Sequence, residues 1–407
     1  MNWKKTTIGK HCMVTSSKRF HLSDRSDSGI PFYCSKEIIQ KVDGQEVTDC
    51  DYIREESYEA VKEKFGVPEC GDLLITTRGT YGIPYIYKAE DKFYFADGNL
   101  TWLKDFDENL EAEFLYYWIL SYEGQKKIDA IAKGTAQKAV PIALIKDIEL
   151  LIPDIDTQKK ITSILSFYDM LIKNNQKQIK LLEEAAQRLY KEWFVDLHFP
   201  EYENVKIVDG VPEGWALKSI LDNEIFVFAK SKVSPFDGEK QYYATADITG
   251  TILTGDGETI TFLNKPSRAA IQPLINSVWF ARMSNTYKIL NCYGESSHIA
   301  NDSIISSGFA GFTSLEGCYG FVYETIASRS FNDEKNRYST GATQVSLTNE
   351  SLKKIEVLIP TIDVAEQYSK LVEPYMLKAE ILKKNCKLLQ QARDRLLPKL
   401  MSGEIEV

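Results

Sequence analysis

Apolar residues follow a heptad pattern over residues 158–194, a stretch that contains neither proline nor glycine. Counted from the first seam position, they recur at alternating intervals of three and four residues, at Leu165, Tyr168, Ile172, Asn175, Ile179, Leu182, Ala186, Leu189 and Trp193. This alternation is typical of a coiled-coil seam rather than of an ordinary amphipathic helix. At about 1.5 Å per residue the helix would be about 55 Å long, too long for one layer of a compact domain. We therefore predict a long helix that connects separate parts of the molecule.

The same pattern returns 207 residues later, at Val372, Tyr375, Ala379, Leu382, Cys386, Leu389, Arg393, Leu396 and Leu400. Upstream of the two seams, residues 134–156 and 341–363 align without a gap and share ten identical residues. Earlier still, FLYYWILS (residues 114–121) aligns with FVYETIAS (residues 321–328). Such a duplication indicates two copies of one unit, each a globular part followed by a long helix. We expect the two helices to pack as an antiparallel pair that holds the globular parts apart.

Short β-like runs and helices fill the globular parts. Glycines and Pro84 separate apolar runs at residues 73–76, 85–87, 93–95 and 101–103. A helix is predicted over residues 111–121 and a strand over residues 148–152. In the second copy, residues 278–282 and 319–328 take the places of the first run and the helix. Each copy opens on a short docking strand, next to Trp3 and Ile8 in the first copy and Trp215 and Ile220 in the second.

These patterns together predict an α+β fold. We expect two similar globular α/β domains, separated by two long antiparallel coiled-coil helices and related by an internal pseudo-two-fold duplication. The predicted boundaries are 1–156 for the first domain, 157–199 for its helix, 200–363 for the second domain and 364–407 for the last helix. The turn-rich residues 229–264 are where the copies diverge most, which suggests two similar tasks on two different ligands.

Composition limits the function classes. The net charge of −9 argues against a general polyanion binder, so any nucleic-acid surface must be local or shared with another subunit. The seven cysteines form no CxxC pair, which favours reduced thiols over a disulfide or zinc framework. No apolar run is long enough for a membrane span and the N-terminus has no secretory h-region, so we expect a cytoplasmic protein without a membrane partner.

Catalytic signatures are missing from the sequence. It contains no GxxxxGK[ST], GxGxxG, HExxH or GxSxG motif, and no Asn-Pro-Pro-aromatic or Asp-Pro-Pro-aromatic tetrapeptide of the amino-methyltransferases. The four histidines lie far apart, and each is better explained as a structural or solvated residue than as a base. We therefore expect a non-catalytic chain with no cofactor and no metal of its own.

Two loops carry residues suited to reading a nucleic acid. ITTRGTYG (residues 75–82, the first reading loop) and FARMSNTYK (residues 280–288, the second reading loop) each follow an apolar run. Arginine can pair with guanine, asparagine with adenine, and threonine with base or phosphate. The candidate DNA-binding residues of the two loops are Thr76, Thr77, Arg78, Thr80, Tyr81, Arg282, Ser284, Asn285, Tyr287 and Lys288. The alternative is a pair of ordinary strand connections with solvated side chains.

Two polar turns precede the closing strands of the two copies. KGTAQK (residues 133–138, the first glycine turn) and STGATQ (residues 339–344, the second glycine turn) offer backbone N–H groups and hydroxyls that could hold phosphates. Their candidate DNA-binding residues are Lys133, Thr135, Gln137, Thr343 and Gln344. The alternative is a repeated turn that only joins a helix to a strand.

The tandem arrangement resembles the specificity subunit of type I restriction-modification systems over nearly the whole chain. The most specific marks are Gly134-Thr135-Ala136-Gln137, the strand end at Ile152-Pro153 and Gln158 at the helix start. The second copy repeats them at Gly341, Gln344, Ile359-Pro360 and Gln367, although Gln367 sits two residues later than a strict repeat requires.

The resemblance implies two target-recognition domains, each reading one half of a bipartite site in double-stranded DNA. It implies that the helices set the spacing and dock two methyltransferase subunits, which restriction motor-nuclease subunits join. S-adenosylmethionine, ATP and Mg are then expected in the partner subunits. We place the docking faces near residues 158–168 and 367–375. The rival interpretation is a non-catalytic coiled-coil adaptor that joins two protein-binding domains.

Overall fold

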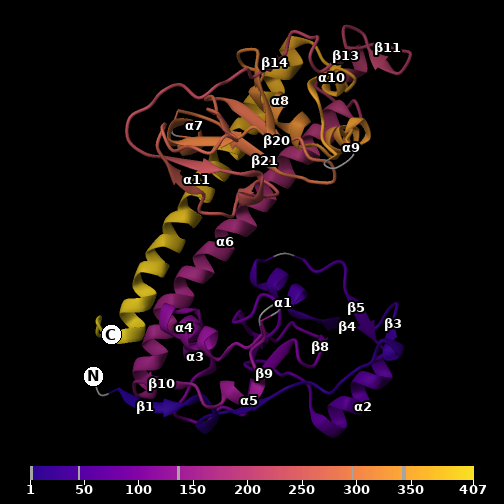
Figure 1. Ribbon diagram of the computed structural model, residues 1–407. Coiled ribbons are helices and arrows are strands. Elements are labelled where there is room, and N and C mark those ends of the chain that lie inside the picture. The colour runs from indigo at the N-terminus through magenta and orange to yellow at the C-terminus, as the bar shows by residue number, and fades with distance from the viewer. Residues whose placement is uncertain (1–2, 45, 135–137, 296, 342–344) are drawn as a thin grey trace. The chain divides into compact units, whose positions relative to one another are not determined.

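The computed structural model describes residues 3–44, 46–134, 138–295, 297–341 and 345–407 (Figure 1). The chain divides into two compact units. The first unit contains Met1–Lys173 and Lys387–Val407, and the second contains Asn174–Cys386. Each unit therefore combines one globular part with a segment of each long helix, whereas the boundaries expected from the sequence follow chain order.

The globular part of the first unit is built on two four-stranded sheets of orders β2-β9-β6-β7 and β3-β5-β4-β8, and on the strand pair β1-β10. Its strands are β1 Lys4–Thr7, β2 Met13–Thr15, β3 Arg25–Ser26, β4 Ile30–Tyr33, β5 Asp51–Ile53, β6 Leu73–Thr76, β7 Pro84–Ile86, β8 Tyr94–Phe95, β9 Leu100–Lys104 and β10 Glu149–Ile152. Its helices are α1 Ser35–Val42, α2 Glu55–Phe65, α3 Ala112–Leu120, α4 Tyr122–Ile131 and α5 Ile142–Ile145.

The second unit repeats this plan with sheets of orders β14-β23-β20-β21 and β18-β15-β22-β19 and the strand pair β13-β24. Its strands are β11 Ile207–Val208, β12 Val211–Pro212, β13 Ala216–Ser219, β14 Phe226–Phe228, β15 Lys240–Tyr243, β16 Ile248–Thr249, β17 Ile252–Leu253, β18 Glu258–Ile260, β19 Ala269–Ile271, β20 Ser277–Ala281, β21 Ile289–Cys292, β22 Ser303–Ser306, β23 Phe309–Ser314 and β24 Glu356–Ile359. Its helices are α7 His298–Asp302, α8 Tyr319–Ala327, α9 Arg329–Tyr338 and α10 Asn349–Leu352.

The duplication is confirmed at the level of topology. In each unit the first sheet places its strands in the same order, and a helix (α3 or α8) follows the last of them in the chain. In the second sheets, β4 pairs parallel with β8 as β15 pairs parallel with β22. The two docking strands are confirmed as β1 and β13, which pair with the closing strands β10 and β24. The divergent region adds the extra strands β16 and β17 to the second unit, and the extra strand β19 follows just after it.

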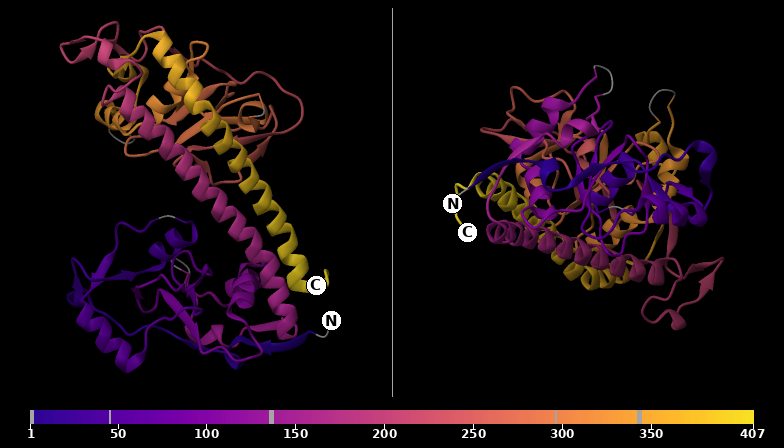
Figure 2. Two further views of the ribbon diagram at one scale, coloured as in Figure 1. Left: turned by 180° about the vertical axis from the view of Figure 1, so that it is seen from behind. Right: turned by 90° about the horizontal axis from the view of Figure 1, so that it is seen from below.

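The two long helices are α6, Ile155–Phe194, and α11, Ile362–Ser402. They pack side by side in both units (Figure 2). In the first unit Arg393 Nη1 lies 2.5 Å from Asp169 Oδ1. In the second unit Lys383 Nζ lies 3.0 Å from Glu183 Oε1, and the Tyr368 hydroxyl donates to Ala186 O at 2.9 Å. Residue numbers fall along α11 as they rise along α6, so the pair is antiparallel, as expected.

The heptad seam of α6 is confirmed. Every seventh residue from Leu165 to Trp193 is buried, and the intervening seam positions, Asn175 among them, are half-buried. In α11 one seam position was assigned wrongly from the sequence. Tyr375 is 39% exposed, while its neighbour Met376 is 4% exposed and packs in the apolar core of the second unit.

The helices complete the two cores rather than only connecting them. In the first unit Leu165 of α6 and Leu397 of α11 belong to the same buried cluster as Phe114 of α3. In the second unit Phe194 of α6 packs 4.7 Å from the ring of Phe321 of α8 and 5.0 Å from that of Tyr368. Burial of these aromatic and aliphatic side chains holds each globular part firmly on its helix segments.

Candidate nucleic-acid interface

The first reading loop leaves strand β6 with its two threonines turned inward. Thr76 and Thr77 are buried. Thr76 Oγ1 accepts a hydrogen bond from the backbone across the loop at 3.0 Å, and Thr77 N donates to Asn99 O at 2.8 Å. Arg78, the next residue, is exposed. The threonines therefore shape the loop, and Arg78 is the side chain that the loop presents to solvent.

The residues that follow the first glycine turn pair with this loop. Ala139 forms isolated antiparallel β-bridges with both Arg78 and Lys133, and Val140 N donates to Thr77 O at 2.8 Å. Lys133 is exposed, as Arg78 is. The backbones of two exposed cations from separate parts of the chain thus bridge to the same residue, and exposed cations suit contacts with phosphates.

Tyr81 faces helix α4 rather than solvent. Its hydroxyl donates to the carboxylate of Asp129, which also accepts from Lys138 Nζ at 3.3 Å. The hydrogen bond to Asp129 raises the pKa of Tyr81, and the same bond lowers the pKa of Asp129. Thr80, one residue earlier, is exposed. Of these two candidates, Thr80 is the one whose side chain is available to a ligand.

The second reading loop repeats the backbone pattern with different side chains. Arg282 N donates to Gly308 O at 2.9 Å, and Leu347 N donates to Arg282 O at 2.8 Å. These bonds match those of Thr77 in the first unit, so Arg282 is the counterpart of Thr77 and not of Arg78. The counterpart of Arg78 is Met283, which forms an isolated β-bridge with Ser346.

The guanidinium of Arg282 is used inside the second unit. It donates to Phe309 O at 3.2 Å, to Leu347 O at 2.9 Å and to Asn349 Oδ1 at 2.8 Å. Burial lowers the pKa of Arg282. This placement corrects the expectation of a solvent-facing reader, because the three acceptors hold the side chain against the segment that follows the second glycine turn.

The remaining candidates of the second reading loop are divided between surface and interior contacts. Asn285 is exposed and has a positive φ of 55°, a conformation that asparagine tolerates. Ser284 is half-buried, and its backbone N–H donates to Val345 O at 3.0 Å. The Tyr287 hydroxyl donates to a carbonyl at the end of α8 at 3.0 Å, and Lys288 Nζ donates to a carbonyl before β16 at 2.8 Å. Asn285 therefore offers the most accessible hydrogen-bonding side chain of this loop.

Four candidates in the glycine turns lie outside the described residues: Thr135, Gln137, Thr343 and Gln344. The residues that flank them are described and pair in the same way in the two units, Lys133 with Ala139 and Thr340 with Ser346. These flanking pairs lie at equivalent positions beside the two reading loops.

A cation that the sequence analysis did not single out lies beside the first reading loop. Arg19 Nε donates to Asp97 Oδ2 at 2.7 Å, and its side chain is 68% exposed. The next residue, Gly98, accepts a hydrogen bond from Thr77 Oγ1 at 3.4 Å through its carbonyl oxygen. Nothing in the local sequence around Arg19 marks it, because its neighbours in space come from strands far along the chain.

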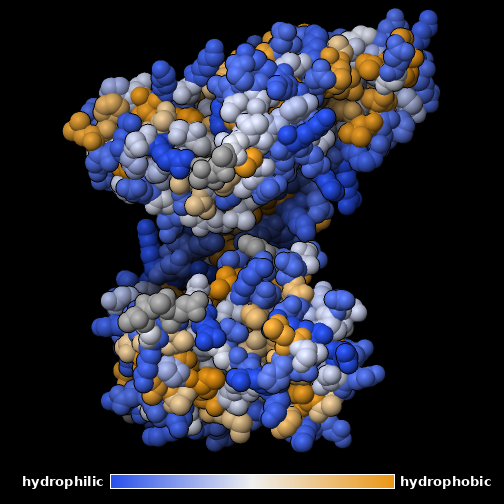
Figure 3. All heavy atoms as spheres, turned by 45° about the vertical axis from the view of Figure 1, so that its right-hand side comes forward, coloured by the Kyte–Doolittle hydropathy of each residue, from blue (hydrophilic) through white to orange (hydrophobic). Residues whose placement is uncertain are grey.

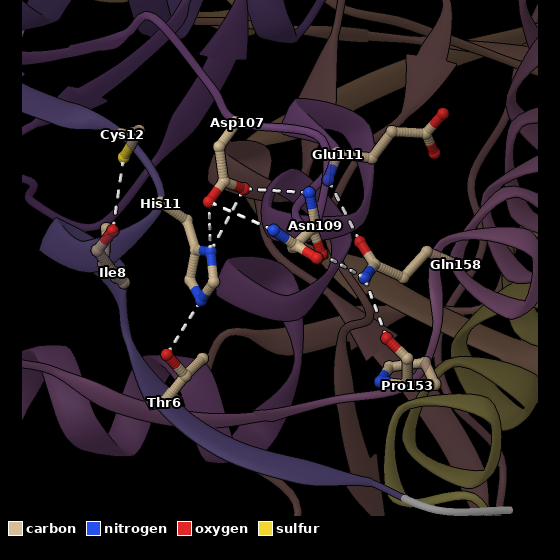
Figure 4. A network of polar contacts seen from close by, with 9 residues as sticks. All are labelled: Thr6, Ile8, His11, Cys12, Asp107, Asn109, Glu111, Pro153 and Gln158. Atoms are coloured by element: carbon tan, nitrogen blue, oxygen red, sulfur yellow. Dashed lines mark hydrogen bonds and ion pairs between the residues drawn. The ribbon is translucent and has the colours of Figure 1, made fainter.

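Helix α6 begins at a buried amide. The side chain of Gln158 is fully buried, and its Nε2 donates to Asn109 O at 2.8 Å and to Pro153 O at 2.9 Å (Figure 4). Its Oε1 accepts from Glu111 N at 3.0 Å. One side chain thus ties the start of the helix to the segment that leads into α3.

The same network continues to the first strand. His11 Nδ1 lies 2.9 Å from Asp107 Oδ2, and His11 Nε2 lies 2.8 Å from Thr6 Oγ1 (Figure 4). Although burial opposes it, hydrogen bonds from Asn109 and His11 lower the pKa of Asp107. Thr6, His11 and Asp107 thus place a hydroxyl, an imidazole and a carboxylate in one row. Thr6, however, lies within β1, which pairs with β10. The structural role expected for His11 fits this position.

The second copy does not repeat the glutamine lock at Gln367, which lies two residues later than a strict repeat requires. Gln367 is exposed, and Ala365, which is fully buried, takes the place of Gln158. Ser369, four residues further along, makes a different contact with α8, since its Oγ accepts a hydrogen bond from Phe321 N at 3.1 Å. Different side chains therefore connect the starts of α6 and α11 to their globular parts, although the surrounding elements are equivalent.

The outer surfaces of the units are largely hydrophilic, with hydrophobic residues in scattered patches on the face shown in Figure 3. Among the described residues, no helix has the length and hydrophobicity needed to cross a membrane. Exposed groups at the reading loops are cations, hydroxyls and an amide, which suit hydrogen bonding to phosphates and base edges.

Comparisons with known proteins agree with this geometry. Residues 1–184 match the type I restriction modification DNA specificity domain. A type I restriction enzyme specificity subunit of Methanocaldococcus jannaschii, MjaIX, is 25% identical over 358 residues, which span 83% of this chain and 78% of the relative. A putative type I restriction enzyme specificity subunit of Haemophilus influenzae is 31% identical over 180 residues, which span 44% of this chain and 43% of the relative.

A solved structure shares the fold. The crystal structure of the S subunit of a type I restriction-modification system from M. genitalium aligns with a TM-score of 0.57 at 16% sequence identity. The alignment covers 98% of this chain and 96% of that one, so the likeness includes both globular parts and both long helices.

Proposed function

Because the chain belongs to the family of type I restriction-modification specificity subunits, we propose that its two globular parts are target-recognition domains for double-stranded DNA. Each domain binds one half of a bipartite sequence, and the helices set the spacing between the halves. The observation that carries the proposal is the repeated loop architecture. In each unit the residues that leave the central strand pair with the segment after the glycine turn through equivalent backbone bonds.

The difference between the two reading loops supports two different half-sites. The first loop presents Arg78 and Thr80 beside Lys133, whereas the second presents Asn285. Arginine favours guanine and asparagine favours adenine in the major groove. A shared backbone frame with different exposed side chains is what a reader of two unlike sequences needs.

We propose that the chain supplies recognition and that its partners supply the chemistry. Two methyltransferase subunits would bring S-adenosylmethionine, and motor-nuclease subunits would bring ATP and Mg when DNA is cut. The chain itself would hold no cofactor. The assembled complex would work in the cytoplasm, where it meets DNA, and needs no membrane partner.

Exposed apolar residues on the long helices support two equivalent docking faces. Met170 of α6 and Leu377 of α11 occupy equivalent positions in the two copies, and both are exposed. The same is true of Leu181 and Leu388. Large exposed apolar side chains that recur at equivalent positions are typical of a surface that another protein covers. Similar faces bind similar partners, which accounts for two methyltransferase copies.

The docking faces that we placed near residues 158–168 and 367–375 extend from the same pattern. Phe167 in the first segment and Leu371 and Tyr375 in the second are exposed. Lysines at positions 159, 160, 173, 177 and 180 surround the α6 positions and would keep the face soluble before assembly.

The proposal is tested with a duplex pool of random sequence. The chain, purified with its methyltransferase, is expected to select a bipartite sequence and to transfer methyl groups from S-adenosylmethionine to it. The chain alone should transfer none. Methyl transfer by the chain alone, or a complex whose mass accommodates only one methyltransferase, would contradict the proposed division of labour. A complex that binds every duplex equally would favour the adaptor interpretation instead.

A further inference from the structure

Each unit presents one leucine almost completely to solvent. Leu22 is 78% exposed in the first unit, and Leu263 is 96% exposed in the second. Both lie on connections beside the second sheet of their unit, and the 207-residue duplication does not align them. Exposure of an isolated leucine is ordinary on a protein surface. The surroundings of these two leucines are what set them apart.

Both leucines stand on turns that are closed by the same kind of hydrogen bond. In the first unit His21 N donates to Asp24 Oδ2 at 2.7 Å, across the short 3-10 helix that begins with Leu22. In the second unit Thr261 N donates to Asn264 Oδ1 at 2.6 Å, across Leu263. A turn capped in this way is ordered before it meets a ligand, so less conformational entropy is lost on binding.

A phenylalanine one or two residues before each leucine anchors the turn to the domain. The ring of Phe20 lies 5.8 Å from that of Phe32 and 5.7 Å from that of Tyr94, in the core of the first unit. The ring of Phe262 lies 5.9 Å from that of Phe236 in the second unit. The aromatic residue is therefore packed inward, while the leucine beside it projects outward.

Both turns are fastened to the reading loops through one equivalent element. In the first unit Arg19 binds Asp97, and the turn formed by residues 97–99 also bonds Thr77 of the first reading loop. In the second unit Ser307 N donates to Arg268 O at 2.9 Å. The next residue, Gly308, accepts the bond from Arg282 of the second reading loop. Each leucine turn is thus tied to the side of the domain that carries the candidate base-reading residues.

The leucines have cationic neighbours. Lys18 and Arg19 precede Leu22 and are exposed, and exposed Arg268 follows Leu263 on the same connection. Two acidic side chains beside this turn are engaged, since Asp24 closes the turn and Asp97 binds Arg19. An apolar tip flanked by cations matches the chemistry of side chains that enter the minor groove between base steps.

We propose that Leu22 and Leu263 are apolar wedges that insert into the DNA, one at each half-site, while the neighbouring cations bind the phosphates. Insertion partly unstacks a base step and bends the duplex, so each half-site would favour an easily deformed step at that position. The inference rests on the proposed function and adds a mode of reading that depends on DNA shape.

The test uses the complex of the full chain with its methyltransferase and the duplex selected from the random pool. Leu22→Ala and Leu263→Ala are each expected to weaken binding by about tenfold and to reduce the bend measured by energy transfer between end labels. The salt dependence should keep its wild-type slope, because a leucine releases no counterions. Arg19→Ala should instead lower the slope by about one.

Matched controls are present in both units. Leu151 and Leu217 are exposed leucines, at 52% and 58%, on strands of the first and second unit. Leu151→Ala and Leu217→Ala should leave affinity and bend unchanged, and Leu22→Met should retain both. Leu22→Ala and Leu263→Ala should each reduce the protection of the duplex only at the half-site that the same unit binds.

The outcomes separate this proposal from the proposed function. If the wild-type complex shows no preference for the selected duplex, the proposed function fails. If it does, and both alanine variants bind and bend that duplex as the wild type does, the wedges are refuted. A variant that binds DNA poorly only because its methyltransferase has dissociated, as its mass would reveal, would assign the leucine to a protein contact and also overturn the proposal.

Discussion

Glu324 is a carboxylic acid buried between helices in the second unit. Its side chain is 2% exposed and accepts a hydrogen bond from Gln187 Nε2. Burial raises the pKa of Glu324 to about 8, and nearby Glu183 adds to the shift while Lys383 opposes it. An ordinary glutamate has a pKa of about 4.3, so the folded chain keeps a proton that the unfolded chain loses at neutral pH.

The free energy of unfolding should therefore fall as pH rises from about 4.3 to 8, with a limiting slope of about 1.4 kcal/mol per pH unit from this group. Glu324→Gln removes the titration and keeps a partner for Gln187. We expect it to stabilise the protein at pH 8 by about 2 kcal/mol and at pH 5 by much less. Urea denaturation at both pH values measures this. Exposed Glu203→Gln makes the same change of charge and should show no such gain. An equal effect of Glu324→Gln at pH 5 and pH 8 would refute the buried acid.

Arg78 and Arg282 provide a second contrast between single residues. Arg78→Ala should cost about 1–3 kcal/mol of discrimination at one half-site, with the melting temperature unchanged, because its side chain is exposed. Arg282→Ala should instead destabilise the fold by about 1–3 kcal/mol, because three acceptors lose their donor. Binding titrations and thermal melts of both variants distinguish the roles.

Exposed Arg329→Ala is the matched control for charge, and neither stability nor discrimination should change. If Arg282→Ala keeps its melting temperature and loses discrimination only at the second half-site, then Arg282 reads bases after all. If Arg78→Ala weakens binding to all sequences equally, then Arg78 binds phosphate and not a base edge.

At the scale of single elements, the start of α6 depends on one side chain. Gln158→Ala would leave Glu111 N, Asn109 O and Pro153 O without their partner inside the protein. Unsatisfied buried groups are costly, so we expect a loss of about 3 kcal/mol in the free energy of unfolding. Gln367→Ala is the matched control, since Gln367 is exposed on α11 and should be neutral. Chemical denaturation of the two variants gives the comparison, and equal stabilities would refute the lock.

The same glutamine shows which parts of the site a sequence can reveal. The residue was marked by its place at the helix start, but its role depends on partners 47 and 49 positions upstream, which come together only in the fold. Gln367 does not take the same role, because it is exposed and Ala365 occupies the strictly aligned position. Likewise Arg78 and Arg282 look alike in sequence, but the backbone pairing of the folded loops makes Thr77 the counterpart of Arg282. The role of each of these residues depends on tertiary hydrogen bonds, which produce no periodic pattern in the sequence.

Elements with a strong period were predicted well. The strand at residues 73–76 was predicted with its exact bounds, the helix at 111–121 within one residue at each end, and α6 with its heptad seam. The second seam went wrong at Tyr375, where the core of the second unit takes up the neighbouring Met376. Periodicity reports which face of a helix is buried, but not which of two adjacent apolar side chains the partner surface accepts.

At the scale of the whole molecule, the duplication was the strongest prediction, because a gapless alignment constrains two folds at once. It predicted a docking strand at the start of each copy, and the structure adds that these strands, β1 and β13, pair with the closing strands β10 and β24. The sequence did not reveal that segments of both long helices would complete the core of each unit. That packing depends on how α3 and α8 meet the helix pair, and no local pattern encodes it.

The helix pair should act as a ruler for the DNA site. Half-sites read by a protein lie roughly 34–36 Å or more apart when one helical turn or more separates them. Asn175 of α6 hydrogen-bonds Cys386 of α11, so the two residues mark facing positions in the antiparallel pair. Insertion of one heptad next to each of them keeps the Asp169–Arg393 and Glu183–Lys383 pairs in register. It lengthens the pair by about 10 Å, or roughly three base pairs.

We therefore expect the doubly inserted chain to select the same two half-sites with a gap about three base pairs longer. A heptad added to α6 alone would place Asp169 and Glu183 out of step with their partners on α11, and the free energy of unfolding should drop. Selection from the random duplex pool reads out the gap, and denaturation reads out the stability. A doubly inserted chain that is as stable as the wild type but still selects the original gap would show that the helices do not set the spacing.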